Sequence, residues 1–275
     1  MSVQVNRGFI VERYKYPDDF INKIICGDCL EVLKQIPDKS INLVLTDPPY
    51  GHNNNNGDLI SRREVALGRG DYIPERDNRP IINDGVEANE IFERFIQETT
   101  RILTDDGVCC CCCSGGGGPN PTFAKWALIM DKYLSFKQMV IWDKGPMGMG
   151  WRYRRSYETI LVASKKNKMA WYDNSKKIEN IIRPGYKGIK KIIPSKDHHP
   201  TQKPVELMKH FIELHTKEND IVLDPFLGSG TTAVACIELN RRFIGIEISP
   251  EYCKMAEERI KNFDSGINQK RLGFI

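Results

Sequence analysis

The chain has 275 residues, with 40 Lys or Arg against 36 Asp or Glu and a formal net charge of +4. At about 150 residues per domain, this length allows one domain with an insertion or two small domains, and we favour the first. The mild positive charge is compatible with a locally basic face for nucleic acid but does not establish one. No apolar run approaches the roughly 20 residues of a membrane span, so no membrane partner is expected. Residues 1–10 lack the apolar core of a signal peptide, and we expect a cytoplasmic protein.

Apolar runs alternate with helical patterns along most of the chain. In chain order the predicted elements are strand Lys23–Cys26, helix Asp28–Ile36, strand Ile41–Thr46, helix Val86–Leu103, strand Val108–Cys113, helix Pro121–Leu134, strands Phe136–Trp142 and Thr159–Ala163, helix Pro204–Thr216, strand Asp220–Asp224, helix Thr231–Asn240, strand Arg242–Ile248 and helix Pro250–Asn262. The helices are predicted from apolar residues spaced three and four apart. The alternation predicts an α/β fold with a mostly parallel, doubly wound sheet covered on both faces.

Five of the nine cysteines are consecutive, from Cys109 to Cys113. Successive side chains of a strand point to opposite faces of a sheet, so this run is poorly arranged for disulfides. Cys109 and Cys112 have a Cys-x-x-Cys spacing, but the second pair of a structural zinc site is missing. We therefore expect no metal and interpret Val108–Cys113 as a buried parallel strand in which cysteine acts as a small hydrophobic residue.

Two segments interrupt the alternation. Residues 51–84 contain an asparagine run and scattered Gly, Pro and Arg; we interpret this long connection as a mobile flap. Residues 165–199 carry ten Lys or Arg, including Lys187, Lys190 and Lys191, with Trp and Tyr interleaved. A solvated face would look similar, but aromatic residues interleaved with basic side chains favour nucleic-acid binding. Arg152 and Arg154, in a glycine-containing segment between two predicted strands, are further candidates for DNA contacts or are merely solvated.

The most informative stretch, Asp47-Pro48-Pro49-Tyr50, directly follows the predicted strand Ile41–Thr46. A carboxylate can accept hydrogen bonds from the edge of a planar amino group. An aromatic ring beside it can stack on the face of the same group. The motif therefore predicts an active site that holds a planar amine at the carboxyl end of a strand.

A second constellation follows the predicted strand Asp220–Asp224. Its loop contains Asp224, Phe226, Gly228, Ser229, Gly230 and Thr231. Glycines allow close backbone approach to a ligand, and the following helix offers free N–H groups. The lysine of a phosphate-binding loop is absent. Glu247 lies about twenty residues after the loop, where an acid typically binds a ribose diol. The pattern indicates an adenosine-containing cofactor that bears an amine and a carboxylate.

Together these motifs resemble the S-adenosylmethionine-dependent DNA amino-methyltransferases, in the group whose catalytic motif precedes its cofactor motif. Asp47–Tyr50 matches the catalytic tetrad, Asp224–Thr232 the cofactor loop and His199–Pro204 the segment before that loop. The resemblance covers roughly residues 23–261. It implies that Asp28 contacts the cofactor adenine and that Lys203 contacts the cofactor carboxylate.

The resemblance implies a Rossmann-like class I methyltransferase fold with an inserted target-recognition region. The implied organisation is an N-terminal extension (1–22), a catalytic half (23–164) with the flap 51–84, a target-recognition insert (165–199), a cofactor-binding half (200–262) and a C-terminal tail (263–275). His198 and His199 are interpreted as structural or cofactor-side residues, because no third metal ligand accompanies them.

The implied reaction transfers a methyl group from S-adenosylmethionine to the exocyclic amine of a base flipped out of double-stranded DNA. Serine more often replaces Asp47 in the cytosine members, so adenine N6 is favoured over cytosine N4. Cytosine carbon-5 chemistry needs a Pro-Cys pair, which the chain lacks. An RNA methyltransferase and a non-catalytic DNA-binding protein are less favoured interpretations. The expected host is a prokaryote, in which the gene is either the cell's own or carried by a phage. A cognate restriction endonuclease and a second copy of the chain in a homodimer are left open as partners.

Overall fold

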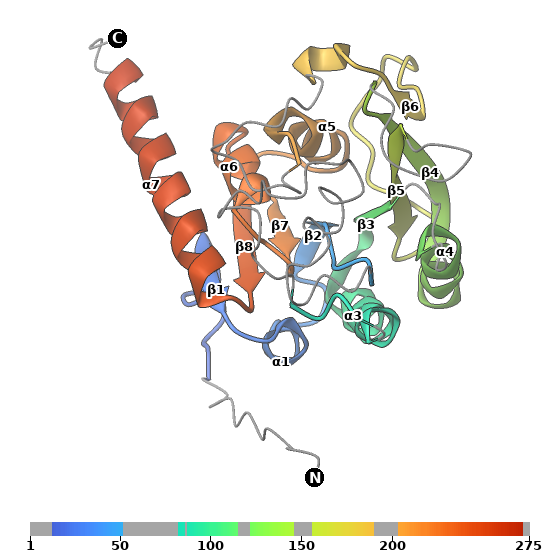
Figure 1. The fold of residues 1–275 in the computed structure, drawn as a ribbon, viewed down its shortest axis with the longest axis horizontal. Coiled ribbons are helices and arrows are strands. Elements are labelled where there is room, and N and C mark those ends of the chain that lie inside the picture. The colour runs from blue at the N-terminus through green and yellow to red at the C-terminus, as the bar shows by residue number, and fades with distance from the viewer. Residues whose placement is uncertain are drawn as a thin grey trace, which may run out of the picture.

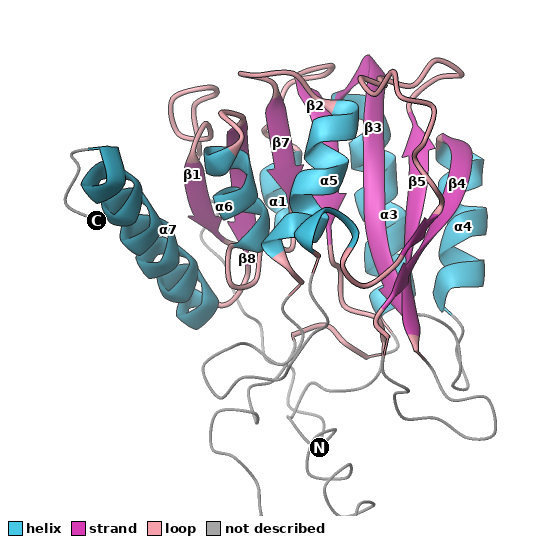
Figure 2. Cartoon of the chain, turned by 90° about the horizontal axis from the view of Figure 1, so that it is seen from above, coloured by secondary structure: helices cyan, strands magenta, loops and turns pink. Residues whose placement is uncertain are grey.

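The computed structural model describes residues 13–51, 82–85, 87–114, 122–145, 156–189 and 203–271. Side chains are described throughout these ranges, except that of Ser114 and those after residue 263. These residues form an eight-stranded sheet in the order β1-β8-β7-β2-β3-β5-β4-β6. Figure 2 shows the strands from β1 to β4 in this order side by side. The strands are β1 Lys23–Cys26, β2 Ile41–Thr46, β3 Leu103–Ser114, β4 Ser135–Asp143, β5 Tyr157–Ser164, β6 Ile181–Ile182, β7 Ile221–Asp224 and β8 Arg242–Glu247.

Helices cover both faces of this sheet (Figure 1). They are α1 Cys29–Leu33, α3 Ala88–Ile102, α4 Thr122–Tyr133, α5 Val205–His215, α6 Thr231–Glu238 and α7 Pro250–Arg271, with a short 3-10 helix, η2, at Tyr186–Gly188. The helices α1, α3 and α4 lie on one face, whereas α5 and α6 lie on the other. Within the described part of the chain, no helix combines the length and apolar character needed to cross a membrane.

The predicted α/β fold is confirmed, with two differences in the strands. The short strand β6 was not predicted, because two residues are too few to show a period. The strand β5 runs antiparallel to both β3 and β4, while the other neighbouring strands run parallel. The helix α7 also continues to Arg271, beyond its predicted end.

The cysteine run forms part of β3, and its side chains alternate between the two cores of the molecule. Cys109, Cys111 and Cys113 pack on the face of α1, α3 and α4, whereas Cys110 and Cys112 pack on the opposite face. All five are buried, and burial raises the pKa of Cys110 and Cys112 well above its ordinary value. The interpretation of this run as a buried strand of small hydrophobic residues is confirmed.

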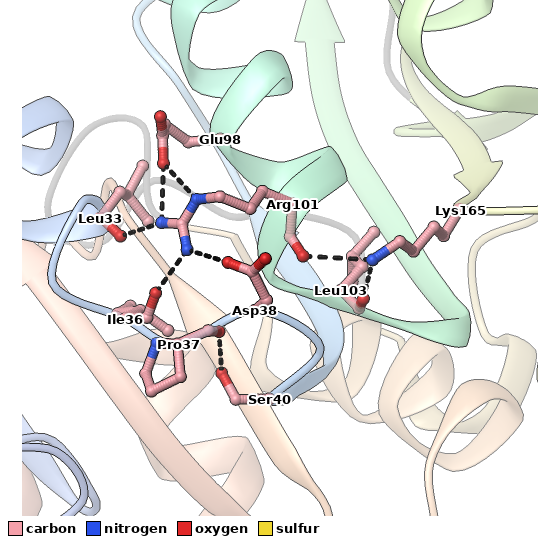
Figure 3. A network of polar contacts seen from close by, with 9 residues as sticks. All are labelled: Leu33, Ile36, Pro37, Asp38, Ser40, Glu98, Arg101, Leu103 and Lys165. Carbon is pink, nitrogen blue, oxygen red and sulfur yellow. Dashed lines mark hydrogen bonds and ion pairs between the residues drawn. The ribbon is translucent and has the colours of Figure 1, made fainter.

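Arg101, near the C-terminus of α3, ties α1 to α3 (Figure 3). Its guanidinium donates to the carbonyl oxygens of Leu33 at 2.9 Å and Ile36 at 2.8 Å. It also pairs with Glu98 at 2.8 Å and Asp38 at 2.7 Å. These contacts bind carbonyl groups at and just beyond the end of α1, where the Leu33 carbonyl also accepts the N–H of Ile36 at 3.1 Å. They lie near the start of β3, so they brace the edge of the sheet opposite the carboxyl ends of the parallel strands.

The order of the strands reverses between β2 and β7. From β2 the chain passes through α3 to β3 on one side, and from β7 it passes through α6 to β8 on the other. Ligands of open α/β sheets bind at the carboxyl ends of the strands at such a point. Asp28, Glu247, Asp224 and Asp47 follow or end β1, β8, β7 and β2, so they line this edge in that order.

Candidate active site

Asp224 links the two halves of the sheet edge. Thr46, the last residue of β2, donates its hydroxyl to Asp224 Oδ1 at 2.6 Å, and Thr232 of α6 donates to Oδ2 at 2.6 Å. The backbone N–H of Phe226 donates to Oδ1 at 3.1 Å. Burial raises the pKa of Asp224 to about 6, although all three donors favour the ionised form. Asp224 therefore sets the path of the glycine loop and joins it to the end of β2.

The two glycines of the loop have different reasons to be glycine. Both have positive φ, 55° at Gly228 and 84° at Gly230. A Cβ atom at Gly230 would lie 3.0 Å from the Cβ atom of Ala256, so this glycine allows α7 to pack closely. A Cβ atom at Gly228 would meet no other described atom within 4 Å. The backbone at Gly228 is therefore open to a ligand.

Arg259 of α7 braces the same loop from outside. It donates to the carbonyl oxygen of Ser229 at 3.2 Å and to the hydroxyl of Thr231 at 2.9 Å. Burial lowers the pKa of Arg259. The sequence did not single out this residue, because the helical pattern of α7 says nothing about which loop it contacts.

Glu247 and Asp28 stand next to each other across β8 and β1. The carboxylate of Glu247 accepts the N–H of Gly228 at 2.8 Å and of Ser249 at 2.9 Å. Burial raises its pKa, against the pull of these N–H donors. Asp28 caps α1 by accepting the N–H of Leu30 at 2.9 Å. The N–H of Gly27 donates to the Glu247 carbonyl at 2.8 Å, which brings the two predicted cofactor residues to one place.

Asp47 lies next in line, in contact with two side chains. The hydroxyl of Tyr50 donates to Asp47 Oδ1, and the ammonium of Lys203 donates to Oδ2 at 2.5 Å. Burial and the Asp47 carboxylate raise the pKa of Tyr50, so its hydroxyl keeps its proton. The Lys203 nitrogen also lies over the Tyr50 ring, 5.6 Å from its centroid. Pro48 is buried and Pro49 half-buried.

The Tyr50 ring is backed by an aromatic stack. Trp126 of α4 contacts it edge-on, with the ring centroids 6.1 Å apart. Trp126 in turn stacks on Phe92 of α3 at 4.0 Å and donates to Asn89 at 3.0 Å. Both supporting rings are fully buried. The stack fixes the position of Tyr50, and the spacing of the sequence motifs did not predict it.

Glu158 is the residue of this site that the sequence motifs missed most clearly. It lies near the start of β5, where Oε2 is 3.3 Å from the Lys203 nitrogen and Oε1 accepts from Lys144 at 2.6 Å. Burial alone would raise the pKa of Glu158, but Lys203 and Lys144 outweigh it and the pKa is lowered. Burial alone would lower the pKa of Lys203, yet Asp47 and Glu158 raise it. Glu158 and Lys203 are therefore both charged at neutral pH.

Several predicted residues are not brought into this site. Lys187, in η2, pairs with Glu213 of α5 at 3.2 Å, and both side chains are exposed. The predicted DNA-contacting residues Lys190, Lys191, Arg152 and Arg154 lie outside the described residues, as do His198, His199 and most of the flap. The two ends of the flap are described, and the N–H of Gly51 donates to the buried Asp84 at 2.7 Å.

Comparison with known proteins assigns a family to this arrangement. A family model described as a DNA methylase matches residues 41–258, from the start of β2 into α7. The chain belongs to the DNA methylase family. The matched region contains both the Asp47–Tyr50 tetrad and the glycine loop. The resemblance found in the sequence is therefore confirmed.

Individual relatives agree with this DNA methylase assignment. The Type II methyltransferase M.HinfI of Haemophilus influenzae is 33% identical over 274 residues, which cover 93% of this chain and 72% of the relative. The Type II methyltransferase M2.DpnII of Streptococcus pneumoniae is 30% identical over 253 residues, covering 87% and 90%. The solved structure of an M1.HpyAVI–SAM complex is 25% identical, with a TM-score of 0.56, and covers 86% of this chain and 98% of that one.

Proposed function

We propose that this DNA methylase transfers the methyl group of S-adenosylmethionine to the N6 amino group of an adenine flipped out of double-stranded DNA. The observation that carries the proposal is the Thr46–Asp224 hydrogen bond of 2.6 Å, which joins the Asp47 tetrad to the glycine loop. The tetrad and the glycine loop are far apart in the sequence, and this hydrogen bond makes them neighbours at the point where the strand order reverses. A solved relative with a SAM complex supports the choice of methyl donor.

The cofactor side fits this donor. Its sulfonium supplies an electrophilic methyl group together with the leaving group, so the protein needs no covalent nucleophile. The carboxylate of Glu247 suits a ribose diol and the open backbone at Gly228 suits close approach of a ligand. We assign Asp28 to the adenine edge of the cofactor, while Asp224, Phe226, Ser229, Gly230 and Thr231 shape the loop. A contact of Lys203 with the cofactor carboxylate stays a prediction.

The catalytic side must activate a poor nucleophile. The lone pair of an exocyclic amine is conjugated with its ring, and it becomes available when the nitrogen turns pyramidal. Hydrogen bonds from the amino protons to the Asp47 carboxylate and the Pro48 carbonyl would stabilise that geometry. As the new N–C bond forms, positive charge develops on the nitrogen beside Asp47, which stabilises it electrostatically and lies ready to receive the departing proton.

The aromatic residues address the cost of base flipping. Extruding a base from a duplex costs a few kcal/mol, and stacking on an aromatic side chain returns about 1 to 3 kcal/mol. Tyr50 follows Asp47 by three residues, so its ring can stack on a base whose amino group contacts Asp47. Because Trp126 and Phe92 hold the ring in place, little side-chain entropy is lost when the base arrives.

We assign DNA recognition to the insert 165–199 with Lys187, Lys190 and Lys191, and to Arg152 and Arg154 between β4 and β5. The described part of the insert exposes Trp171 and Tyr172 among its lysines. The Type II names of the relatives support a bacterial restriction-modification setting, with a cognate endonuclease as partner and a cytoplasmic location. A homodimer stays a prediction, as does the division into catalytic half, insert and cofactor half.

Replacing Asp47 tests the proposal. Asp47→Ala should lower methyl transfer from labelled cofactor to unmethylated genomic DNA to below about a thousandth of the wild-type rate. Cofactor affinity, measured by calorimetry, should stay within about threefold. Asp47→Asn serves as a second variant, because it keeps a partner for Lys203. Asp131→Ala, at an exposed acid on α4, is the matched control. Full activity of both Asp47 variants would refute the assignment of Asp47 to the reaction. N4-methylcytosine in the digested product would show that the target base is cytosine and not adenine.

A further inference from the structure

In the structure, Lys203 occupies both contacts that the proposed function assigns to the target base. Its ammonium donates to the Asp47 carboxylate at 2.5 Å, the group that should receive the base amine. The same nitrogen lies over the Tyr50 ring, 5.6 Å from its centroid, where the base should stack. An ammonium over an aromatic face is attracted by the ring, so Lys203 has two reasons to stay there. Lys203 thus takes the place of the base amine.

This position of Lys203 conflicts with methyl transfer. The base nitrogen gains positive charge as its bond to the methyl carbon forms, and a neighbouring ammonium repels that charge. An ammonium paired with Asp47 also draws electron density from the carboxylate and weakens it as an acceptor for the amino protons. Lys203 must therefore move away from Asp47 before the reaction, although it must remain paired because it is only 7% exposed.

Glu158 offers the second position that Lys203 needs. Its Oε2 atom is buried and makes no hydrogen bond with any described residue, yet it lies 3.3 Å from the Lys203 nitrogen. Charge-assisted N–H to O hydrogen bonds are about 2.7 to 2.9 Å long. A movement of about half an ångström at the end of a flexible side chain would therefore complete this bond, and further rotation of the same side chain would carry the ammonium away from Asp47.

Lys144 keeps Glu158 ready for this exchange. It pairs with the other oxygen, Oε1, at 2.6 Å, and holds the carboxylate in place while Oε2 stays available. Lys203 and Lys144 together also keep Glu158 ionised despite its burial, since its pKa is lowered. A buried carboxylate that remains charged and has one open acceptor atom is suited to receive an ammonium.

We propose that Lys203 is a movable counter-ion, which neutralises Asp47 while the site is empty and shifts to Glu158 when the base amine arrives. Glu158 is then a positioning residue, which acts on the reaction through Lys203 and touches neither the base nor the cofactor. This role rests on the proposed function, because it presupposes an amine that donates to Asp47.

A double-mutant cycle tests the exchange. Glu158→Gln keeps the shape of the side chain but removes the charge that attracts Lys203, so kcat should fall at least about tenfold while the cofactor Kd stays within about twofold. Adding Lys203→Met removes the ammonium that is trapped on Asp47. The double variant should therefore be at least about fivefold faster than Glu158→Gln alone, and Glu158→Gln should change kcat less than about twofold in the Lys203→Met background.

Glu238→Gln is the matched control, because Glu238 pairs with Lys209 at 2.6 Å outside the site and its loss should leave kcat unchanged. Thermal unfolding of each variant checks its folding. If Glu158→Gln does not fold, Glu158→Asp replaces it in both backgrounds, since a shortened carboxylate reaches Lys203 less well.

The outcomes separate this inference from the proposed function. A wild-type chain that transfers no methyl group to DNA refutes the function itself. With an active wild type, equal losses from Glu158→Gln in both backgrounds refute the exchange, as does an unchanged kcat in the single variant. A cofactor Kd raised more than about tenfold by Lys203→Met, with no effect of Glu158→Gln, would instead place Lys203 at the cofactor carboxylate.

Discussion

The proposed cofactor side and the proposed catalytic side of the sheet edge both contain carboxylates that are buried or partly buried, but they balance the negative charge in different ways. On the cofactor side, Asp224 and Glu247 accept hydrogen bonds from hydroxyl and backbone N–H groups. On the catalytic side, Asp47 and Glu158 contact the ammonium groups of Lys203 and Lys144. The pKa of Asp224 and Glu247 is raised, whereas that of Glu158 is lowered.

The difference shows what each side is built to do. Neutral donors offset only part of the cost of burying a carboxylate, but they come from the loop itself and therefore fix its path. An ammonium offsets more of that cost and sits at the end of a flexible stem, so it can move. Under the proposed function, the cofactor side is a fixed cradle, and the catalytic side holds the charge that we propose is exchanged.

The largest expected effect concerns the pH dependence of stability. The pKa of Asp224 is about 6 in the folded chain and 3.8 ordinarily, so the folded state binds a proton between these values that the unfolded state does not. The contribution of Asp224 to the unfolding free energy is therefore present below about pH 4 and is lost as pH rises through 6. The loss is on the order of 3 kcal/mol.

Urea unfolding of wild type and Asp224→Asn at about pH 4, 5, 6 and 7 measures this effect, because the variant cannot titrate at this position. Asp131→Asn, at an exposed acid, is the control and should follow the wild-type curve. Glu158, whose pKa is lowered, contributes with the opposite sign, since its stabilisation is lost as pH falls. Identical curves for wild type and Asp224→Asn would show that the two sides do not differ in this way.

A smaller effect is expected for cofactor affinity at Glu247. Glu247→Gln replaces an acceptor for the ribose diol by a neutral amide, and a hydrogen bond to a charged group is worth about 1.5 to 3 kcal/mol. The Kd for S-adenosylmethionine should therefore rise roughly 10- to 100-fold in calorimetry, with kcat at saturation within about threefold. Glu258→Gln, at an exposed position on α7, controls for the lost charge. A fall in kcat at unchanged Kd would assign Glu247 to the catalytic side.

The smallest effect is expected at Arg259, which supports the loop without reaching the ligand site. Arg259→Met removes the donors to the Ser229 carbonyl and the Thr231 hydroxyl, so the loop loses part of its preorganisation. The cofactor Kd should rise about three- to fivefold, and kcat at saturation should not change. Lys254→Met, at an exposed position on the same helix, is the control. An affinity equal to that of Lys254→Met would show that the loop keeps its shape unaided.

Most of the fold and the cofactor cradle could be predicted because they depend on local chain order. A buried strand followed by Asp47–Tyr50, and another followed by the glycine loop and then by Glu247, are readable from spacing alone. Parallel strands place such motifs at one edge of a sheet. Asp47, Asp224, Glu247 and Asp28 are accordingly brought together as their positions in the chain predicted.

Glu158 shows why the rest could not be predicted. A residue at the start of a parallel strand would lie at the opposite edge, but β5 runs antiparallel to β3 and pairs Glu158 with Ser114 at the end of β3. Hydrophobic periodicity carries no information about strand direction. The partners of Lys203 were equally hidden, because side-chain pairing across 156 residues depends on how the elements pack.

The sequence by itself determined the α/β class, the buried cysteine strand and the places of the Asp47–Tyr50 motif and the glycine loop after their strands, since each follows from a local pattern of side chains. The tertiary structure alone decided that Lys203 lies between two carboxylates, that Trp126 and Phe92 support Tyr50, and that Arg259 braces the loop. Those contacts arise from packing between distant elements, where direction and distance are set by the whole fold.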